Sequence, residues 1–114
     1  AASGIKYYIE VANMPTTNDA LEFLKEQKHM VIAPSKAVNA CGVAVSALEM
    51  AQNAERLYWT AEEVDAKMHQ IMANIYHSSV AAAERYGLGY DLVAGANLVG
   101  FQRVADAMMA QGIF

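Results

Sequence analysis

Two loop segments carry the polar side chains that could bind a small ligand, and the first of them covers residues 12–17. Asn13 lies in this segment, just beyond a predicted strand, at the edge where open α/β sheets bind ligands. Its side-chain amide offers both a hydrogen-bond donor and an acceptor. Asparagine also shapes turns without touching a ligand, and on the residues alone that simpler role is the more common one.

The second segment, residues 34–46, leads from another predicted strand into the start of a helix. Unpaired N–H groups at a helix start attract anions, and Gly42 would let a ligand approach the backbone closely. Asn39 either caps this helix or contributes to a site. Ser46 lies one turn further on, on the same face as Val43, and its hydroxyl could hydrogen-bond a carboxylate. The residues alone leave both alternatives open.

The usual signatures of catalysis are missing from the chain, which lacks the H-E-x-x-H, C-x-x-C, P-loop and G-x-S-x-G patterns. His69 and His77 are eight residues apart and lack a supporting set of carboxylates or thiols, so we predict no metal site. Gly87 and Gly89 follow a helix rather than a strand, which is typical of a helix end and not of a dinucleotide-binding turn.

The elements that would position these segments form a strand, a helix and a second strand, followed by helices only. Alternation of Ile5, Tyr7, Ile9 and Val11 with polar neighbours predicts a strand at 5–12 with those four side chains buried. A short helix ends near Lys28, and an apolar run predicts a second, buried strand at 30–33. The order is that of a parallel β-α-β unit. Further helices are predicted at 41–55, 61–86 and 92–111.

Helix boundaries have clear local signals. Thr60 and Glu63 form a capping box at the start of the long helix, and Gly87 is placed to end it. Asp91 is a candidate cap for the last helix. Apolar side chains along that helix predict its inner face: Leu98, Phe101, Ala105 and Met108.

Length and composition indicate one domain with a real core, since 55% of the 114 residues are hydrophobic and 18% are charged, and the order of the predicted elements makes its fold class α/β. The net charge of -4 and the scattered basic residues argue against nucleic acid as a partner. No run is long enough for a membrane span, so we expect no membrane partner. The single cysteine, Cys41, favours a reducing compartment, and we expect the cytoplasm. Because the chain lacks a start residue and enters a strand-like run almost at once, we expect an excised piece of a longer protein; removal of an initiator Met is the alternative.

Several blocks of sequence, in order and covering nearly the whole chain, resemble the glutamate dehydrogenase family among the hexameric glutamate, leucine, phenylalanine and valine dehydrogenases. They are residues 13–17, 33–46, 48–53, 59–64, 95–101 and 105–108. The resemblance is to the carboxy-terminal segment of these enzymes. It implies a single segment, 1–114, from a Rossmann-like nucleotide-binding domain, with a strand-helix-strand-helix portion at 5–53 and a carboxy-terminal helical portion at 60–112.

The same resemblance implies a function and the residues that serve it. The family interconverts L-glutamate with 2-oxoglutarate and ammonia and uses NADP or NAD, of which we expect NADP. Asn13 and Asn39 match positions that line the nicotinamide-ribose end of the cofactor cleft. Val43 and Ser46 match positions that contact the substrate, with the serine hydroxyl directed at the side-chain carboxylate. The family assembles into homohexamers, so we expect a homo-oligomer.

The chain departs from the family pattern at Val11 and Cys41, where glycine is usual, and it lacks the family's catalytic lysine and aspartate. We therefore predict no catalytic residue in this segment and no activity of the isolated chain. A different hypothesis makes the chain an independent helical interaction module, derived from the enzyme but without catalysis.

Overall fold

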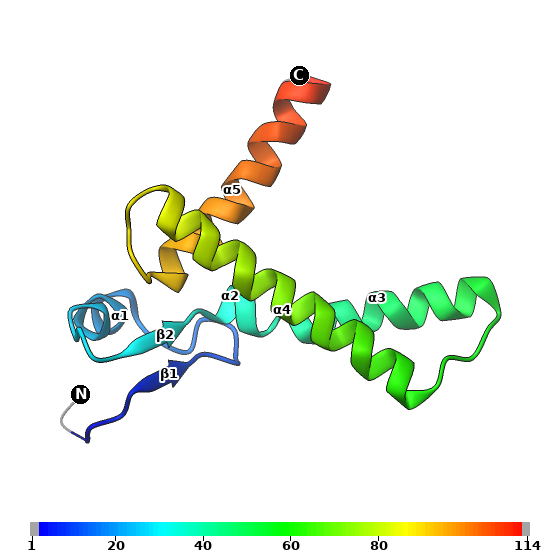
Figure 1. Ribbon diagram of the computed structural model, residues 1–114, viewed down its shortest axis with the longest axis horizontal. Coiled ribbons are helices and arrows are strands. Elements are labelled where there is room, and N and C mark those ends of the chain that lie inside the picture. The colour runs from blue at the N-terminus through cyan, green and yellow to red at the C-terminus, as the bar shows by residue number, and fades with distance from the viewer. Residues whose placement is uncertain (1–2, 113–114) are drawn as a thin grey trace.

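The structure, a computed structural model, describes residues 3–112, so residues 1, 2, 113 and 114 of the predicted segment lie outside the described part (Figure 1). Within that part, the elements are β1 (Tyr7–Ile9), α1 (Asn18–Lys25), β2 (Val31–Ala33), α2 (Ser35–Val38), α3 (Ala40–Glu55), α4 (Ala61–Arg85) and α5 (Leu92–Gln111). The chain is mainly helical with two strands, as predicted.

The two strands pair in parallel, with Tyr7 opposite Val31, which confirms the predicted arrangement. The predicted strand at 5–12 is too long, because β1 spans three residues only. Its pairing partner is equally short: β2 ends before Pro34, whose nitrogen has no proton to donate to a ladder. One further bond, from Glu10 N to Ala33 O at 3.0 Å, prolongs the pairing beyond β1.

The buried face of β1 is the opposite of the predicted one. Ile5, Tyr7, Ile9 and Val11 are all exposed, whereas Glu10 is 6% exposed. Side chains alternate between the two faces of a strand, so only one face can meet the rest of the chain here. In residues 3–112, the helices pack on the face that carries Glu10 and leave the more apolar face open.

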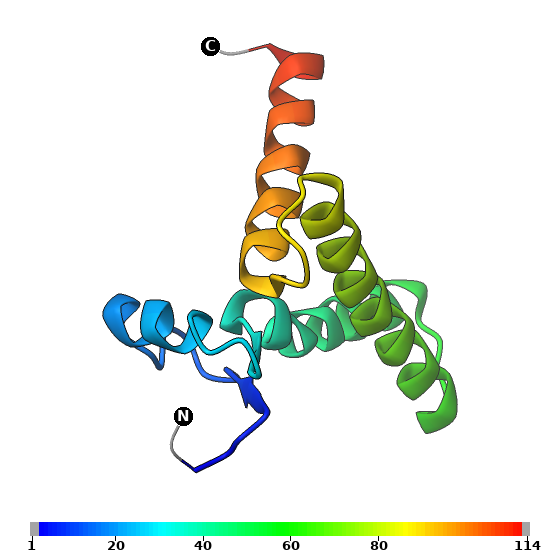
Figure 2. The ribbon, with the colours of Figure 1, turned by 60° about the vertical axis from the view of Figure 1, so that its left-hand side comes forward.

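The long helices make two arms that meet near the sheet (Figures 1 and 2). Helices α3 and α4 run side by side away from the strands, and α5 crosses α4 close to its own start and then diverges from it. The crossing supplies much of the small core, in which Ile32, Ala83 and Leu92 are buried.

The predicted inner face of α5 is wrong at two of its four residues. Phe101 is 72% exposed and Met108 is 42% exposed, so neither side chain is buried against another element within residues 3–112. In the part of the chain that the structure describes, no helix is long and apolar enough to cross a membrane.

Local signals set the helix boundaries largely as predicted. Thr60 accepts from Glu63 N at 3.2 Å, and Thr60 N donates to the Glu63 carboxylate at 2.7 Å, which confirms the capping box. Helix α4 ends at Arg85, one residue before the predicted end, and Gly87 follows with a φ of +71°. Asp91 caps α5 as predicted. The single-turn helix α2 was not predicted, and α3 begins at Ala40, one residue early.

Candidate functional site

The two asparagines predicted to line a cofactor cleft lie in direct contact. Asn13 follows β1, and Asn39 ends α2, which itself follows β2, so both stand beyond the carboxyl ends of the parallel strands. The Asn39 side-chain nitrogen, Nδ2, donates a hydrogen bond to the Asn13 oxygen, Oδ1. This bond leaves the Asn13 amide nitrogen to donate to a ligand and the Asn39 oxygen to accept from one.

A cavity of about 710 Å³ contains this asparagine pair. Its walls come from the loop after β1, from α1, from α2 and from the start of α5. Lys36 and Asn97 line the same cavity, and the Lys36 ammonium donates to the Asn97 side-chain oxygen. The cavity therefore combines amide donors and acceptors with the Lys36 ammonium and the Glu10 carboxylate, at the edge where open α/β sheets bind ligands.

The two predicted substrate residues lie apart from this cavity, on the first two turns of α3. Val43 is 75% exposed, and Ser46 is exposed. The Ser46 hydroxyl donates to the carbonyl oxygen of Gly42 at 3.2 Å, which is a bond within its own helix. Since a hydroxyl oxygen has two lone pairs, Ser46 can still accept, and its proton can be redirected to a ligand. In residues 3–112, these two side chains face open space.

Three further residues of the cavity were not predicted: Glu10, Lys36 and Asn97. Glu10 occupied a polar position of the predicted strand and was assigned to the solvent side. Asn97 lies in residues 95–101, which resemble the family but contain no predicted site residue. Their placement depends on contacts across 25 residues between Ser35 and Glu10 and 61 residues between Lys36 and Asn97, which local patterns do not contain.

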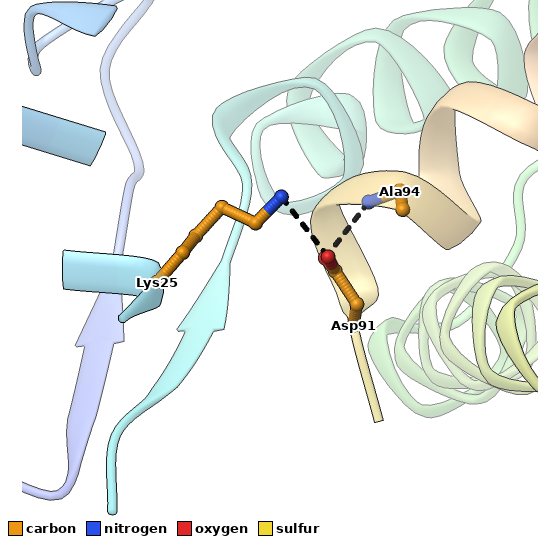
Figure 3. A network of polar contacts seen from close by, with 3 residues as sticks. All are labelled: Lys25, Asp91 and Ala94. Carbon is orange, nitrogen blue, oxygen red and sulfur yellow. Dashed lines mark hydrogen bonds and ion pairs between the residues drawn. The ribbon is translucent and has the colours of Figure 1, made fainter. Parts of the chain in front are cut away.

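A second polar cluster fixes the start of α5 against α1 (Figure 3). Asp91 forms an ion pair with Lys25 at 3.0 Å and accepts from Ala94 N at 2.9 Å. Burial raises the pKa of the Asp91 carboxyl, but the bonds from Ala94 and Lys25 outweigh it, so the pKa lies below its usual value. This cluster holds the helix that delivers Asn97 to the cavity.

The histidines of α4 do not form a metal site in the described part of the chain. His69 lies 4.0 Å from the Asp65 carboxylate, and His77 packs edge-on against Tyr76 with ring centroids 5.2 Å apart. Residues 3–112 contain no group of three or more His, Cys, Asp or Glu side chains that could hold a metal ion.

Comparison with known proteins gives a consistent match. The NAD-specific glutamate dehydrogenase of Clostridium symbiosum is 73% identical over 112 residues, covering 98% of this chain and 25% of that protein. The NADP-specific glutamate dehydrogenase of Escherichia coli K12 is 54% identical, again over 98% of this chain and 25% of the relative. A solved structure of a glutamate dehydrogenase superposes with a TM-score of 0.94 at 73% identity, covering 98% of this chain and 25% of that one.

The chain thus spans about a quarter of the length of these relatives. The family model for glutamate/leucine/phenylalanine/valine dehydrogenases matches residues 1–112, nearly the whole chain. This extent of match, together with the shared backbone, shows that the chain belongs to the glutamate/leucine/phenylalanine/valine dehydrogenase family.

Proposed function

We propose that this chain is part of the nucleotide-binding half of a glutamate dehydrogenase and forms the nicotinamide end of its cofactor cleft. The observation that carries the proposal is the Asn13–Asn39 pair in the cavity beyond the strand ends. A paired donor and acceptor complement a carboxamide, and the cavity lies where parallel sheets receive nucleotides. The matched relatives are named glutamate dehydrogenases, which supports the same assignment.

The substrate side of the proposal rests on α3. Asn39 immediately precedes this helix, so a ligand at the asparagine pair lies next to its first turns. There the Ser46 hydroxyl would donate a hydrogen bond to the side-chain carboxylate of glutamate, and Val43 would contact the aliphatic part. A polar group at this point discriminates against aliphatic amino acids, which would leave it unpaired.

The cofactor is proposed to be a nicotinamide dinucleotide, with NAD favoured over the NADP expected from the sequence. The relative with 73% identity is named NAD-specific, whereas the relative with 54% identity is named NADP-specific. The proposal also places the chain in the carboxy-terminal part of a homohexameric subunit. The groups that transfer protons then come from outside this chain, so the isolated chain is inactive.

Two substitutions in a complete subunit carrying this segment test the two halves of the site. Ser46→Ala should lower kcat/KM for glutamate by roughly tenfold to a hundredfold, the loss of about 1.5–3 kcal/mol for a hydrogen bond to a charged group. Asn39→Ala should instead raise the KM of the dinucleotide and leave the KM of glutamate nearly unchanged. Ser78→Ala, on α4, is the matched control. Unchanged glutamate kinetics in Ser46→Ala would remove the substrate role.

A further inference from the structure

Glu10 has an unusual position for a carboxylate, because it is 6% exposed and stands directly after β1. Burial of a charged group is unfavourable unless hydrogen bonds replace the lost water. Here the Glu10 Oε2 atom accepts from Ser35 N at 3.1 Å. The Glu10 backbone N–H also donates to Ala33 O at 3.0 Å, which ties both ends of the residue to the β2–α2 connection.

These contacts belong to a closed ring that includes the cofactor asparagines. Ser35 is the first residue of the single-turn helix α2, and its carbonyl oxygen accepts from Asn39 N at 2.8 Å. The Asn39 side chain then donates to Asn13, which stands three residues after Glu10. One short helix therefore connects the Glu10 carboxylate to the asparagine pair.

We infer that Glu10 is the positioning residue of the cofactor cleft: through Ser35 and α2, it holds Asn39 where its amide can pair with Asn13. The inference rests on the proposed function, since it takes that pair to bind the dinucleotide. A side chain oriented before binding loses less conformational freedom when the ligand arrives, so this support should raise affinity for the dinucleotide.

The negative charge of Glu10 argues that this residue positions other groups and does not itself contact the dinucleotide. The carboxylate lines the same cavity as the asparagines, and at close range it would repel the phosphates of a dinucleotide. Its Oε2 atom is already engaged with the start of α2. We therefore assign the effect of Glu10 on the ligand to its bond with the start of α2 rather than to direct contact.

The test uses the complete dehydrogenase subunit and perturbs the Glu10–Ser35 bond from both sides. Glu10→Ala removes the acceptor, and Glu10→Gln keeps an acceptor oxygen of the same shape. Ser35→Pro removes the backbone N–H donor and leaves the Glu10 acceptor in place. It should keep α2, because proline is well tolerated at the first position of a helix and Pro34 already has the extended backbone that a following proline requires. Glu55→Ala, an exposed glutamate at the end of α3, is the control.

We expect Glu10→Ala to raise the KM of the dinucleotide about tenfold, the loss from one buried charge-assisted bond, while the KM of glutamate stays within about twofold. Glu10→Gln should restore most of the affinity, because its amide oxygen still accepts from Ser35. The double variant Glu10→Ala/Ser35→Pro should be no worse than Glu10→Ala, since both changes break the same bond. A merely structural residue would lower the melting temperature without this selective change in KM.

Three results would overturn the inference. The first is an unchanged dinucleotide KM in Glu10→Ala alongside a raised one in Asn39→Ala, which would leave the proposed function intact. The second is equal loss for both substrates in Glu10→Ala and Glu10→Gln. If Glu10→Ala does not fold, the third is a normal dinucleotide KM in Ser35→Pro. An unchanged KM in Asn39→Ala would instead reject the proposed function itself.

Discussion

The crossing of α4 and α5 makes one substitution particularly informative, because the two backbones touch there without an intervening side chain. A Cβ atom added to Gly95 would stand 2.0 Å from the carbonyl oxygen of Ser79 and 2.8 Å from its carbonyl carbon. Ordinary van der Waals contact begins at 3.4 Å. Since both atoms are backbone, no side-chain rotation can relieve the overlap in Gly95→Ala, and the two helices have to move apart.

Two opposing effects set the magnitude. Separating the helices loosens the packing of Ala83 and Leu92, and overpacking of this kind costs about 3 kcal/mol at the upper end of its usual range. Alanine is a better helix former than glycine by about 1 kcal/mol, which offsets part of the loss. The net expectation is a destabilisation of about 2 kcal/mol, or a fall in melting temperature of roughly 8 °C for a chain of this size.

Thermal unfolding followed by the helical circular dichroism signal of the purified protein measures this change. Gly100→Ala is the matched control, because Gly100 lies on the same helix and an added Cβ would meet nothing within 4 Å. That variant has only the gain in helix propensity, so its melting temperature should rise by a few degrees. If Gly95→Ala were as stable as Gly100→Ala, the close crossing of α4 and α5 would be refuted.

Three other predictions address the caps and the chemistry. Thr60→Ala should cost about 1 kcal/mol in the free energy of unfolding, because it removes half of the capping box, and Thr60→Ser should not. Asp91→Asn keeps the cap but loses the ion pair with Lys25. Because the pKa of Asp91 is lowered in the folded chain, the ion pair stabilises the fold at neutral pH, and this stabilisation is lost as the pH falls through that pKa. The free energies of unfolding of the two proteins should therefore converge below about pH 4. Urea titrations at two pH values check this, and a constant difference contradicts it. The purified 114-residue chain should show no glutamate-dependent reduction of NAD or NADP, and measurable turnover would contradict the absence of catalytic groups.

Local interactions were predictable from the sequence. The capping box of Thr60 and Glu63 and the cap at Asp91 involve residues three positions apart, so their pattern appears within a single turn of sequence. Parallel pairing followed from the order of a strand, a helix and a second strand. The buried face of β1 did not follow, because alternation shows that two faces differ but not which one the helices will cover. Helix α2 could not be predicted, because its four residues are too few to show a helical period of apolar side chains.

The candidate site was only half predictable for a related reason. Asn13 and Asn39 were assigned to one ligand by resemblance, but the direct bond between their side chains spans 26 residues and depends on α2. Taken alone, Asn39 was equally consistent with a helix cap. Its side chain makes no cap bond and instead donates to Asn13 across the cleft. Only the tertiary arrangement, which brings the two residues together, determines this contact.

Packing at the helix crossing and geometry at the cleft are coupled through α5. Gly95, which allows the close approach to Ser79, is two residues before Asn97, which binds Lys36 in the wall of the cavity. Lys36 belongs to α2, the same turn that carries Asn39. A displacement of α5 at Gly95 would therefore be passed through one polar contact to the asparagine pair. The small core of this chain thus helps to set the shape of the site proposed to receive the nicotinamide.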